Sequence, residues 1–326
     1  MLVLPDFRLL TPRTLPEALA ALSATPDEAI PLAGGTDLLP NLKHGLFAPD
    51  RLVSLRRVDA LRDVHETESG GLFLGAGLTL AQVAAHPRVR SRYPALAEAA
   101  SLVAGPQLRE MGTLGGNLCL ETRCVFYNQT RFWRDALGYC LKKDGTVCHV
   151  VPKGTRCVAA HSADTPGPLM IYGATLLLAS ARGERTVPVQ SFFRGDGVRN
   201  TVRQPDELVL GVTLPAPPPG LRAAYVKLRV RQAIDFPVLS VAVSVVEDEG
   251  RLVEDVTLVV GAVASQPRMI KGAADAARGR VLDAALASEL GALAQAQCHF
   301  QPSLNVDSQW RRDVLPVFVR RALAAC

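Results

Sequence analysis

The sequence predicts an α+β protein of two domains, and three observations lead to this fold class. Before residue 214, short apolar runs of strand type alternate with capped helical segments and glycine turns. Residues 214–220 (LPAPPPG) then form a stiff run that continues neither a helix nor a central strand. Beyond this run, β-branched residues alternate along the chain as they do in an antiparallel sheet. We therefore expect one domain over 1–217 and a second over 218–326.

The first domain is expected to contain two subdomains, at about 1–50 and 51–217, because two units of strand, glycine turn and helix follow one another. For the first subdomain the sequence predicts a helix after a capping box at Thr14, Pro16 and Glu17, a loop at Pro26 and Asp27, a strand over 29–33 and a helix over 38–44. For the second it predicts a strand over 72–77, helices over 79–86 and 93–105, and strands within 169–180.

One segment of the first domain departs from this pattern. Residues 119–162 are polar, aromatic and cysteine-rich, and they show neither helical nor strand periodicity, which predicts an inserted loop. In the second domain the pattern is regular again. It predicts strands over 223–230, 238–247 and 252–263, followed by helices at about 281–296 and 307–324.

Composition excludes several classes of protein. The chain has 326 residues, of which 48% are hydrophobic, and its net charge of +5 is spread without a run of five basic residues. These values argue against disorder and against a nucleic-acid-binding surface. The start (MLVLPDFRLLTP) lacks the features of a signal peptide, and the uncharged stretch at 165–181 contains two prolines and two glycines. We expect a soluble cytoplasmic protein that binds neither nucleic acid nor membrane.

Two glycine turns are candidates for cofactor binding. They are residues 33–37 (AGGTD) and 112–117 (GTLGGN), and they lie about eighty residues apart. Glycine allows the backbone N–H groups to approach a pyrophosphate closely, and Thr36, Thr113 and Asn117 can add side-chain hydrogen bonds. Neither turn fits the dinucleotide fingerprint or the P-loop, which argues against NAD or ATP. Each turn alone could be a plain chain reversal, but the pair favours a cofactor site.

The cysteines indicate a metal or redox site. Five of the seven cysteines fall within the expected insert, and the last four have the spacing Cys124-x15-Cys140-x7-Cys148-x8-Cys157. Thiolates are soft ligands, and four of them suit either zinc or an iron–sulfur cluster. Structural zinc usually shows a closer cysteine pair, and Cys119 with Cys124 forms a C-x4-C pair. From spacing alone, zinc and an iron–sulfur cluster both stay open. Seven basic residues of this stretch would offset the charge of a thiolate-bound cluster or form a solvated surface: Arg123, Arg131, Arg134, Lys142, Lys143, Lys153 and Arg156.

These motifs resemble those of a known family. Residues 112–117, with 75–80 (GAGLTL), resemble the flavin-binding loops of the FAD subunits of the xanthine dehydrogenase family. Residues 261–270 and 310–323, together with Lys227, Arg231 and Asp235, resemble that family's C-terminal domain, so the likeness runs from about residue 4 to 323. It implies a PCMH-type (vanillyl-alcohol-oxidase-like) FAD-binding domain followed by a CO dehydrogenase flavoprotein-like domain.

The cysteine-rich insert resembles one branch of that family. Residues 117–124 (NLCLETRC), followed by FYNQT, GYCLK and CHV, are similar to the insert of the 4-hydroxybenzoyl-CoA reductase β subunits. In that branch the insert holds a [4Fe-4S] cluster. The resemblance therefore implies that Cys124, Cys140, Cys148 and Cys157 ligate such a cluster, with Cys119 left over.

The resemblance also implies where FAD binds. It assigns the pyrophosphate to two loops, Leu32, Ala33, Gly34, Gly35, Thr36, Asp37 and Leu38 in the first and Thr113, Leu114, Gly115, Gly116 and Asn117 in the second. Asp164 would lie near the ribose or adenine, and Lys227 and Asp235 near the isoalloxazine. Some relatives carry a larger polar residue at the position of Gly35, so one side-chain contact is lost here. No catalytic acid, base or nucleophile is expected on this chain.

The implied activity is that of an oxidoreductase subunit. Electrons from a ferredoxin-type donor would pass through [4Fe-4S] and FAD to a [2Fe-2S] small subunit and a molybdenum cofactor-containing large subunit. These partners, assembled as a dimer of heterotrimers, would reduce 4-hydroxybenzoyl-CoA to benzoyl-CoA. Two alternatives stay open. One is the FAD subunit of a xanthine or CO dehydrogenase-type hydroxylase, in which electrons leave through the flavin, and the other is a zinc-binding interaction protein.

Overall fold

The first subdomain is a small parallel sheet with two helices. The computed structural model describes residues 3–24 and 28–326, so the loop expected at Pro26 and Asp27 lies outside the described residues. Strands β1 (Arg8–Leu10), β3 (Arg51–Ser54) and β2 (Ala29–Leu32) pair in that order, all parallel. Helix α1 (Leu15–Ser23) follows Thr14, whose hydroxyl accepts the Glu17 N–H, as the capping residues predict. Helix α2 (Leu38–Lys43) directly follows the first glycine turn.

The second subdomain contains a five-stranded antiparallel sheet. Its strand order is β4 (Val64–Glu66), β5 (Leu72–Gly75), β8 (Leu208–Leu214), β6 (Thr175–Ser180) and β7 (Gly183–Pro188). The 3-10 turn η1 (Asp59–Arg62) precedes β4. Buried leucine, valine and alanine side chains join this sheet to short helices in one core. Those helices are α3 (Leu80–Ala85), α4 (Pro87–Arg92), α5 (Pro94–Ser101), α7 (Leu114–Leu118), α9 (Pro166–Ile171) and α10 (Val189–Phe192). The short helix α6 (Pro106–Arg109) buries none of its residues and precedes the second glycine turn.

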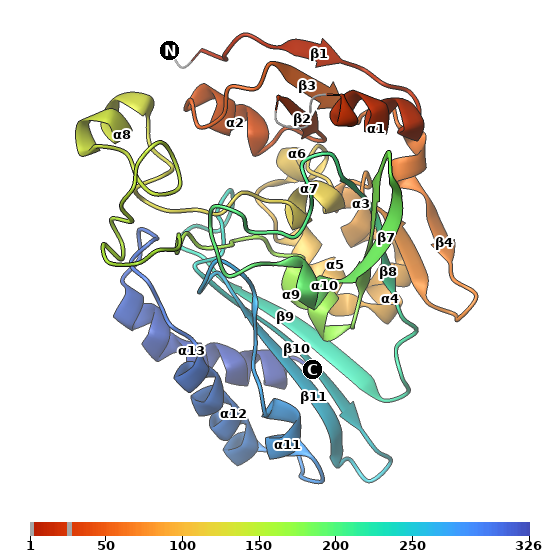
Figure 1. Ribbon diagram of the computed structural model, residues 1–326. Coiled ribbons are helices and arrows are strands. Elements are labelled where there is room, and N and C mark those ends of the chain that lie inside the picture. Colours follow the sequence, from red (N-terminus) through yellow and green to blue (C-terminus); the bar gives the residue numbers. More distant parts are fainter. Residues whose placement is uncertain (1–2, 25–27) are drawn as a thin grey trace.

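The C-terminal part is an antiparallel sheet covered by helices, as the sequence predicts. Its strand order is β12 (Arg268–Met269), β11 (Val253–Gly261), β10 (Leu239–Glu247) and β9 (Leu221–Leu228). Helices α11 (Ala273–Ala277), α12 (Ala284–Gln297) and α13 (Ser308–Ala324) pack on one face, where Figure 1 shows them in blue. A Cβ on Gly291 of α12 would lie 3.0 Å from the Cα of Pro316, so glycine allows α12 and α13 to approach closely.

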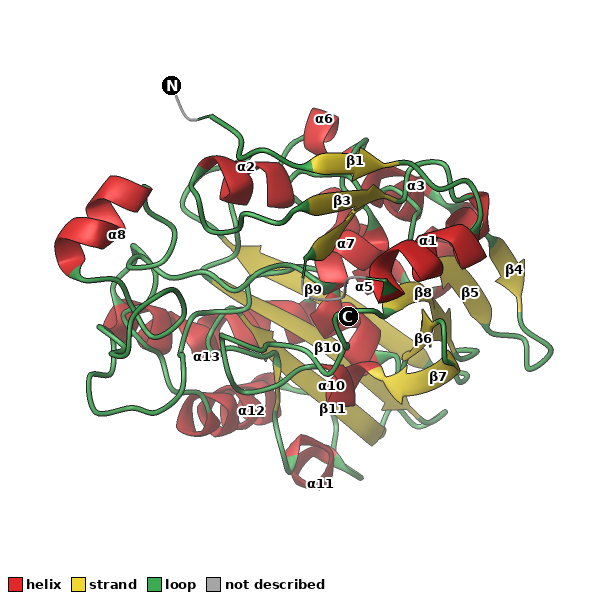
Figure 2. Cartoon of the chain, turned by 45° about the horizontal axis from the view of Figure 1, so that its top comes forward, coloured by secondary structure: helices red, strands yellow, loops and turns green. Residues whose placement is uncertain are grey.

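The other face of this sheet packs on the second subdomain. Helices α5 and α9 contact β9, β10 and β11, and the Ser244 hydroxyl donates a hydrogen bond of 3.2 Å to the Ile171 carbonyl. Figure 2 shows the three-stranded sheet above this assembly, with the four-stranded sheet below it. The large cavity described below is therefore bounded by segments from all three parts of the chain.

Two expectations about local structure need correction. Residues 169–180 are not all strand, because Pro166 starts helix α9, which ends at Ile171, and the strand β6 begins at Thr175. A proline in the first turn of a helix leaves no intrahelical hydrogen bond unmade, so this start is favourable. The insert also contains a helix, α8 (Arg131–Leu137), whose N-cap is Thr130. In Figure 1 this helix stands away from the body of the molecule.

No helix within residues 3–24 and 28–326 combines the length and the apolar character that crossing a membrane requires.

Candidate functional site

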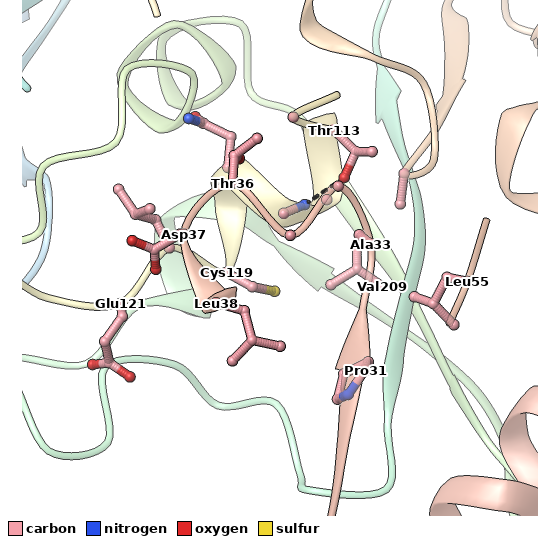
Figure 3. Close-up of a pocket in the computed structure, with 18 of the residues that line it drawn as sticks. Pro31, Ala33, Thr36, Asp37, Leu38, Leu55, Thr113, Cys119, Glu121 and Val209 are labelled. Atoms are coloured by element: carbon pink, nitrogen blue, oxygen red, sulfur yellow. Dashed lines mark hydrogen bonds between the residues drawn. The ribbon is translucent and has the colours of Figure 1, made fainter. Parts of the chain in front are cut away.

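A large cavity lies where the two glycine turns meet. Its volume is about 1000 Å³, and it is bounded by the first glycine turn, the second glycine turn, the segment 194–209 and residues 234–236. Figure 3 shows Ala33, Thr36, Asp37, Leu38 and Thr113 around it. Pockets of several hundred to 1000 Å³ are typical of cofactor and ligand sites.

The two glycine turns touch each other, although about eighty residues separate them. A Cβ on Gly34 would lie 1.9 Å from the Met111 carbonyl oxygen, so no other residue allows this approach. Gly35 has φ +72°, the left-handed region that glycine adopts without strain. A Cβ on Gly116 would meet only the Thr113 hydroxyl, at 3.0 Å, within 4 Å. Gly116 therefore offers its backbone to the cavity rather than to a neighbouring strand.

Most residues expected to hold FAD line this cavity. They are Ala33, Gly34, Gly35, Thr36, Asp37, Leu38, Thr113, Gly115, Gly116, Asn117 and Asp235. Leu32 and Leu114 belong to the same two turns but do not line it. The Asn117 side-chain oxygen accepts hydrogen bonds from the Thr165 N–H (3.1 Å) and hydroxyl (2.7 Å), which fixes α7 against α9.

Asp164 and Lys227 lie elsewhere, in contact with each other. The Lys227 ammonium is 2.9 Å from the Asp164 carboxylate, and the side chains of Lys227 and Asp164 are 1% and 3% exposed. The Tyr225 hydroxyl donates to the same carboxylate at 2.7 Å, and Lys227 also donates to the Leu102 carbonyl at 2.9 Å. Burial raises the pKa of Asp164 and lowers that of Lys227, and each partner opposes the shift of the other. The pair joins β9 to α5 and to the segment before α9.

An arginine-bearing wall was not anticipated from the sequence. Arg194, Arg199 and Arg203 line the cavity from the segment between α10 and β8. Arg203 donates to the carbonyls of Gln204, Pro205 and Glu207, which shapes its own loop. Guanidinium groups suit phosphate recognition, so this wall favours an anionic ligand. Residues 194–203 (RGDGVRNTVR) contain three arginines, which the sequence alone could have marked as a basic segment. Only the fold shows that all three line the cavity.

The four cysteines of the expected cluster converge on a second, small cavity. Cys124, Cys140, Cys148 and Cys157 are all buried and line it together. Cys119 does not belong to this group and lines the large cavity instead. Burial, together with the three neighbouring cysteines, raises the pKa of the Cys124 thiol to about 11.

Four buried cysteines around one cavity are the type of donor that zinc and iron–sulfur clusters both use. Burial raises the pKa of the Cys124 and Cys157 thiols, and a bound metal would favour their ionised form. In the described part of the chain, no three His, Cys, Asp or Glu side chains are grouped as they would be around a single metal ion.

One ion pair lies between the two cavities. Arg123, next to Cys124 in the chain, pairs with Asp37 of the first glycine turn. Its guanidinium also lies 4.2 Å from the centre of the Phe236 ring, and its backbone exchanges hydrogen bonds of 2.8 and 2.7 Å with Ala160. Burial raises the pKa of the Asp37 carboxyl, and Arg123 opposes this. The start of the insert is thus fixed against the large cavity.

Comparison with known proteins agrees with this geometry. The family model described as the FAD binding domain in molybdopterin dehydrogenase matches residues 5–217, and the CO dehydrogenase flavoprotein C-terminal domain matches 223–326. The chain is 33% identical over 268 residues to the FAD-binding subunit of an Escherichia coli aldehyde oxidoreductase, covering 78% of this chain and 81% of that one.

Relatives of full length show the same likeness. The chain is 27% identical to the carbon monoxide dehydrogenase medium chain of Hydrogenophaga pseudoflava, with 98% and 97% of the two chains covered. A solved structure of carbon monoxide dehydrogenase from that organism superposes with a TM-score of 0.81 over 99% of this chain and 98% of that one, at 27% identity. This chain belongs to the FAD-binding subunits of the xanthine dehydrogenase/CO dehydrogenase family of molybdenum hydroxylases.

Proposed function

We propose that this chain is the FAD and [4Fe-4S] subunit of a 4-hydroxybenzoyl-CoA reductase. Electrons from a ferredoxin-type donor would reach the molybdenum-containing partner by way of this subunit. The overall reaction consumes two electrons and two protons, replaces the para hydroxyl of 4-hydroxybenzoyl-CoA by hydrogen and releases water. The observation that carries the proposal is the convergence of Cys124, Cys140, Cys148 and Cys157 on one buried cavity beside the flavin site.

FAD would occupy the large cavity. The two glycine turns would accept its pyrophosphate at the backbone, because a Cβ on Gly116 would meet only the Thr113 hydroxyl, at 3.0 Å, within 4 Å. The wall of Arg194, Arg199 and Arg203 adds positive charge near the phosphates. Asp235 lines the same cavity and holds its own loop by accepting the N–H groups of Val230 and Arg231. The Asp164–Lys227 pair acts on this site indirectly, by joining the domains that enclose it.

The cysteines would hold the cluster as thiolates. When bound, the flavin and the cluster supply electron storage and transfer, while the protein sets their position and electrostatic surroundings. The buried side chains of Tyr127 and Leu46 form one apolar cluster with Cys124, Cys140 and Cys157 and limit access of water there. No side chain of this chain is needed as an acid, base or nucleophile.

Other subunits would complete the enzyme. The names of the relatives, FAD-binding subunit and medium chain, describe components of larger assemblies. We propose a molybdenum cofactor-containing large subunit and a [2Fe-2S] small subunit, assembled as a dimer of heterotrimers in the cytoplasm. The exposed basic side chains of the insert, Arg131, Lys153 and Arg156, would attract an acidic ferredoxin, and salt would weaken this attraction.

A second function is favoured by the relatives themselves. The chain is 29% identical over 255 residues to a xanthine dehydrogenase FAD-binding subunit of Escherichia coli O157:H7 and 27% identical to a carbon monoxide dehydrogenase medium chain. A hydroxylase of this kind oxidises its substrate, and its electrons leave through the flavin subunit. The cysteine cavity has no obvious use in that direction of flow.

The holoenzyme with Cys140→Ser tests the proposal. We expect it to lose ferredoxin-driven reduction of 4-hydroxybenzoyl-CoA, while dithionite still reduces its flavin and Cys326→Ala retains both reactions. Cys326 is a suitable control because it lies at the C-terminal end, away from the small cavity. Reduction from ferredoxin at the normal rate by the Cys140 variant, or oxidation of xanthine or carbon monoxide by wild type without any reductase activity, would overturn the proposal.

A further inference from the structure

One basic side chain of the insert differs from its neighbours in being buried at the small cavity. Lys142 lines that cavity with the four cysteines, and its side chain is 4% exposed. Arg134 is buried as well, but it donates to the carbonyls of His44, Gly45 and Gln129 and does not line the cavity. Lys143, the next residue, is 30% exposed and lies 3.2 Å from the Asp144 carboxylate.

The Lys142 ammonium reaches from the small cavity to the wall of the large one. It pairs with the Glu121 carboxylate and donates to the Thr122 hydroxyl and the Gly197 carbonyl. Its Nζ is also 4.7 Å from the centre of the Tyr127 ring, which lies beside the cysteines. Glu121 lines the large cavity, and Gly197 precedes Val198 and Arg199, which line it too. Lys142 therefore has the thiols on one side and the flavin site on the other.

Gly197 shows how tightly this junction is packed. A Cβ there would lie 2.7 Å from the Cys157 sulfur, and the Gly197 N–H donates to the Cys157 carbonyl at 2.8 Å. The Thr122 hydroxyl, fully buried, donates to the Gly197 carbonyl at 2.8 Å. Because water is excluded here, the charge of Lys142 acts on nearby groups with little screening.

We propose that Lys142 is a positioning residue that raises the reduction potential of the cluster, with Glu121 opposing it. The inference rests on the proposed function, since it requires the four cysteines to carry a cluster. One-electron reduction adds a negative charge to a cluster that thiolates already make negative. A buried ammonium beside it favours the reduced form, and a carboxylate beside it disfavours that form. The donor of the electron is a one-electron reductant of the ferredoxin class.

Three variants of the purified flavin subunit test this by redox titration, with the cluster followed by its electron paramagnetic resonance signal. Lys142→Met removes the buried charge, and we expect the equilibrium constant for cluster reduction to fall at least tenfold, which is about 59 mV for one electron. Glu121→Gln removes the opposing charge, and we expect a shift in the other direction. Lys143→Met makes the same change of charge one residue away, at a side chain that is more exposed than Lys142. It should change the equilibrium constant for cluster reduction less than threefold.

The outcomes separate the inference from the proposed function. Wild-type protein without iron overturns both. If the wild-type protein holds a cluster, but the cluster potential in Lys142→Met equals that of wild type or differs from it no more than in Lys143→Met, the inference alone is overturned. If Lys142→Met does not retain iron, Lys142→Gln decides, because it removes the charge and keeps a side-chain donor for the Thr122 hydroxyl and the Gly197 carbonyl. A cluster potential that falls in Lys142→Gln, with iron content unchanged, supports the inference, and an unchanged potential overturns it.

Discussion

The Cα of Gly34 lies so close to the carbonyl of Met111 that a Cβ would be 1.9 Å from its oxygen. This contact brings the first glycine turn against the second, and both residues line the large cavity. On the second turn, a Cβ on Gly116 would meet only the Thr113 hydroxyl, at 3.0 Å, within 4 Å. The two glycines therefore have different roles, since Gly34 permits the fold and Gly116 leaves room for a ligand.

Replacing Gly116 tests the position of the flavin. We expect Gly116→Val to abolish FAD binding, because the added side chain occupies the backbone face that the pyrophosphate would approach. Flavin released from purified protein, measured against protein concentration, gives the occupancy. Gly250→Ala is the control, since Gly250 is exposed and a Cβ there approaches no atom closer than 3.3 Å. Full FAD occupancy in the Gly116 variant would place the pyrophosphate elsewhere.

The five cysteines of the insert divide into four ligands and one spare. We expect Cys119→Ser to retain about four irons per chain, because Cys119 lines the large cavity and not the small one. Cys124→Ser should lose the cluster, since its sulfur lines the small cavity. Iron and acid-labile sulfide analysis of anaerobically purified protein measures both. Equal loss of iron in the two variants would contradict this division.

The Asp164–Lys227 pair predicts a large effect on stability. In Lys227→Met the Asp164 carboxylate stays buried without its cation, and breaking such a pair costs about 3–5 kcal/mol of unfolding free energy. Arg278→Met breaks an exposed pair with Asp275 and should cost less than about 1 kcal/mol. Urea unfolding of the two variants gives the difference. Similar midpoints for both would mean that the pair does not join the domains.

His161 predicts that stability falls at acid pH. Burial lowers the pKa of His161 to about 4 from an ordinary value of 6.5, so the unfolded chain binds the proton more readily than the folded one between these values. The contribution of neutral His161 to the unfolding free energy is fully present above pH 6.5. Up to about 3 kcal/mol of it is lost as the pH falls toward 4. His161→Phe should flatten this part of the curve of unfolding free energy against pH. An unchanged slope in that variant would assign the acid sensitivity to other groups.

Local patterns predicted the elements well where one signal dominated. The capping residues at Thr14 and the alternation in β10 and β11 fixed a helix and two strands correctly. The strand expected over 169–180 was wrong in its first part, because apolar residues after Pro166 suit a buried helix as well as a strand. Four cysteines at unequal spacing indicated a site, but their convergence depends on how the insert turns back through Ala160.

The charged residues were the hardest to place from sequence. Asp164 and Lys227 are 63 residues apart, and their contact exists because β9 packs beside the segment before α9. The same holds for Glu121 and Lys142, whose pairing depends on the path of the insert. The arginines at 194–203 lie in an irregular segment, and no periodicity indicates which of them face the cavity.

Whether this chain holds both FAD and an iron–sulfur cluster can be measured by anaerobic purification and analysis of flavin, iron, acid-labile sulfide and zinc. We expect a yellow-brown protein with one FAD, about four irons and about four sulfides per chain, and no stoichiometric zinc. A yellow protein with FAD and no iron, even after anaerobic reconstitution, would contradict the cluster and favour a conventional hydroxylase subunit. A colourless protein with zinc would contradict the account as a whole.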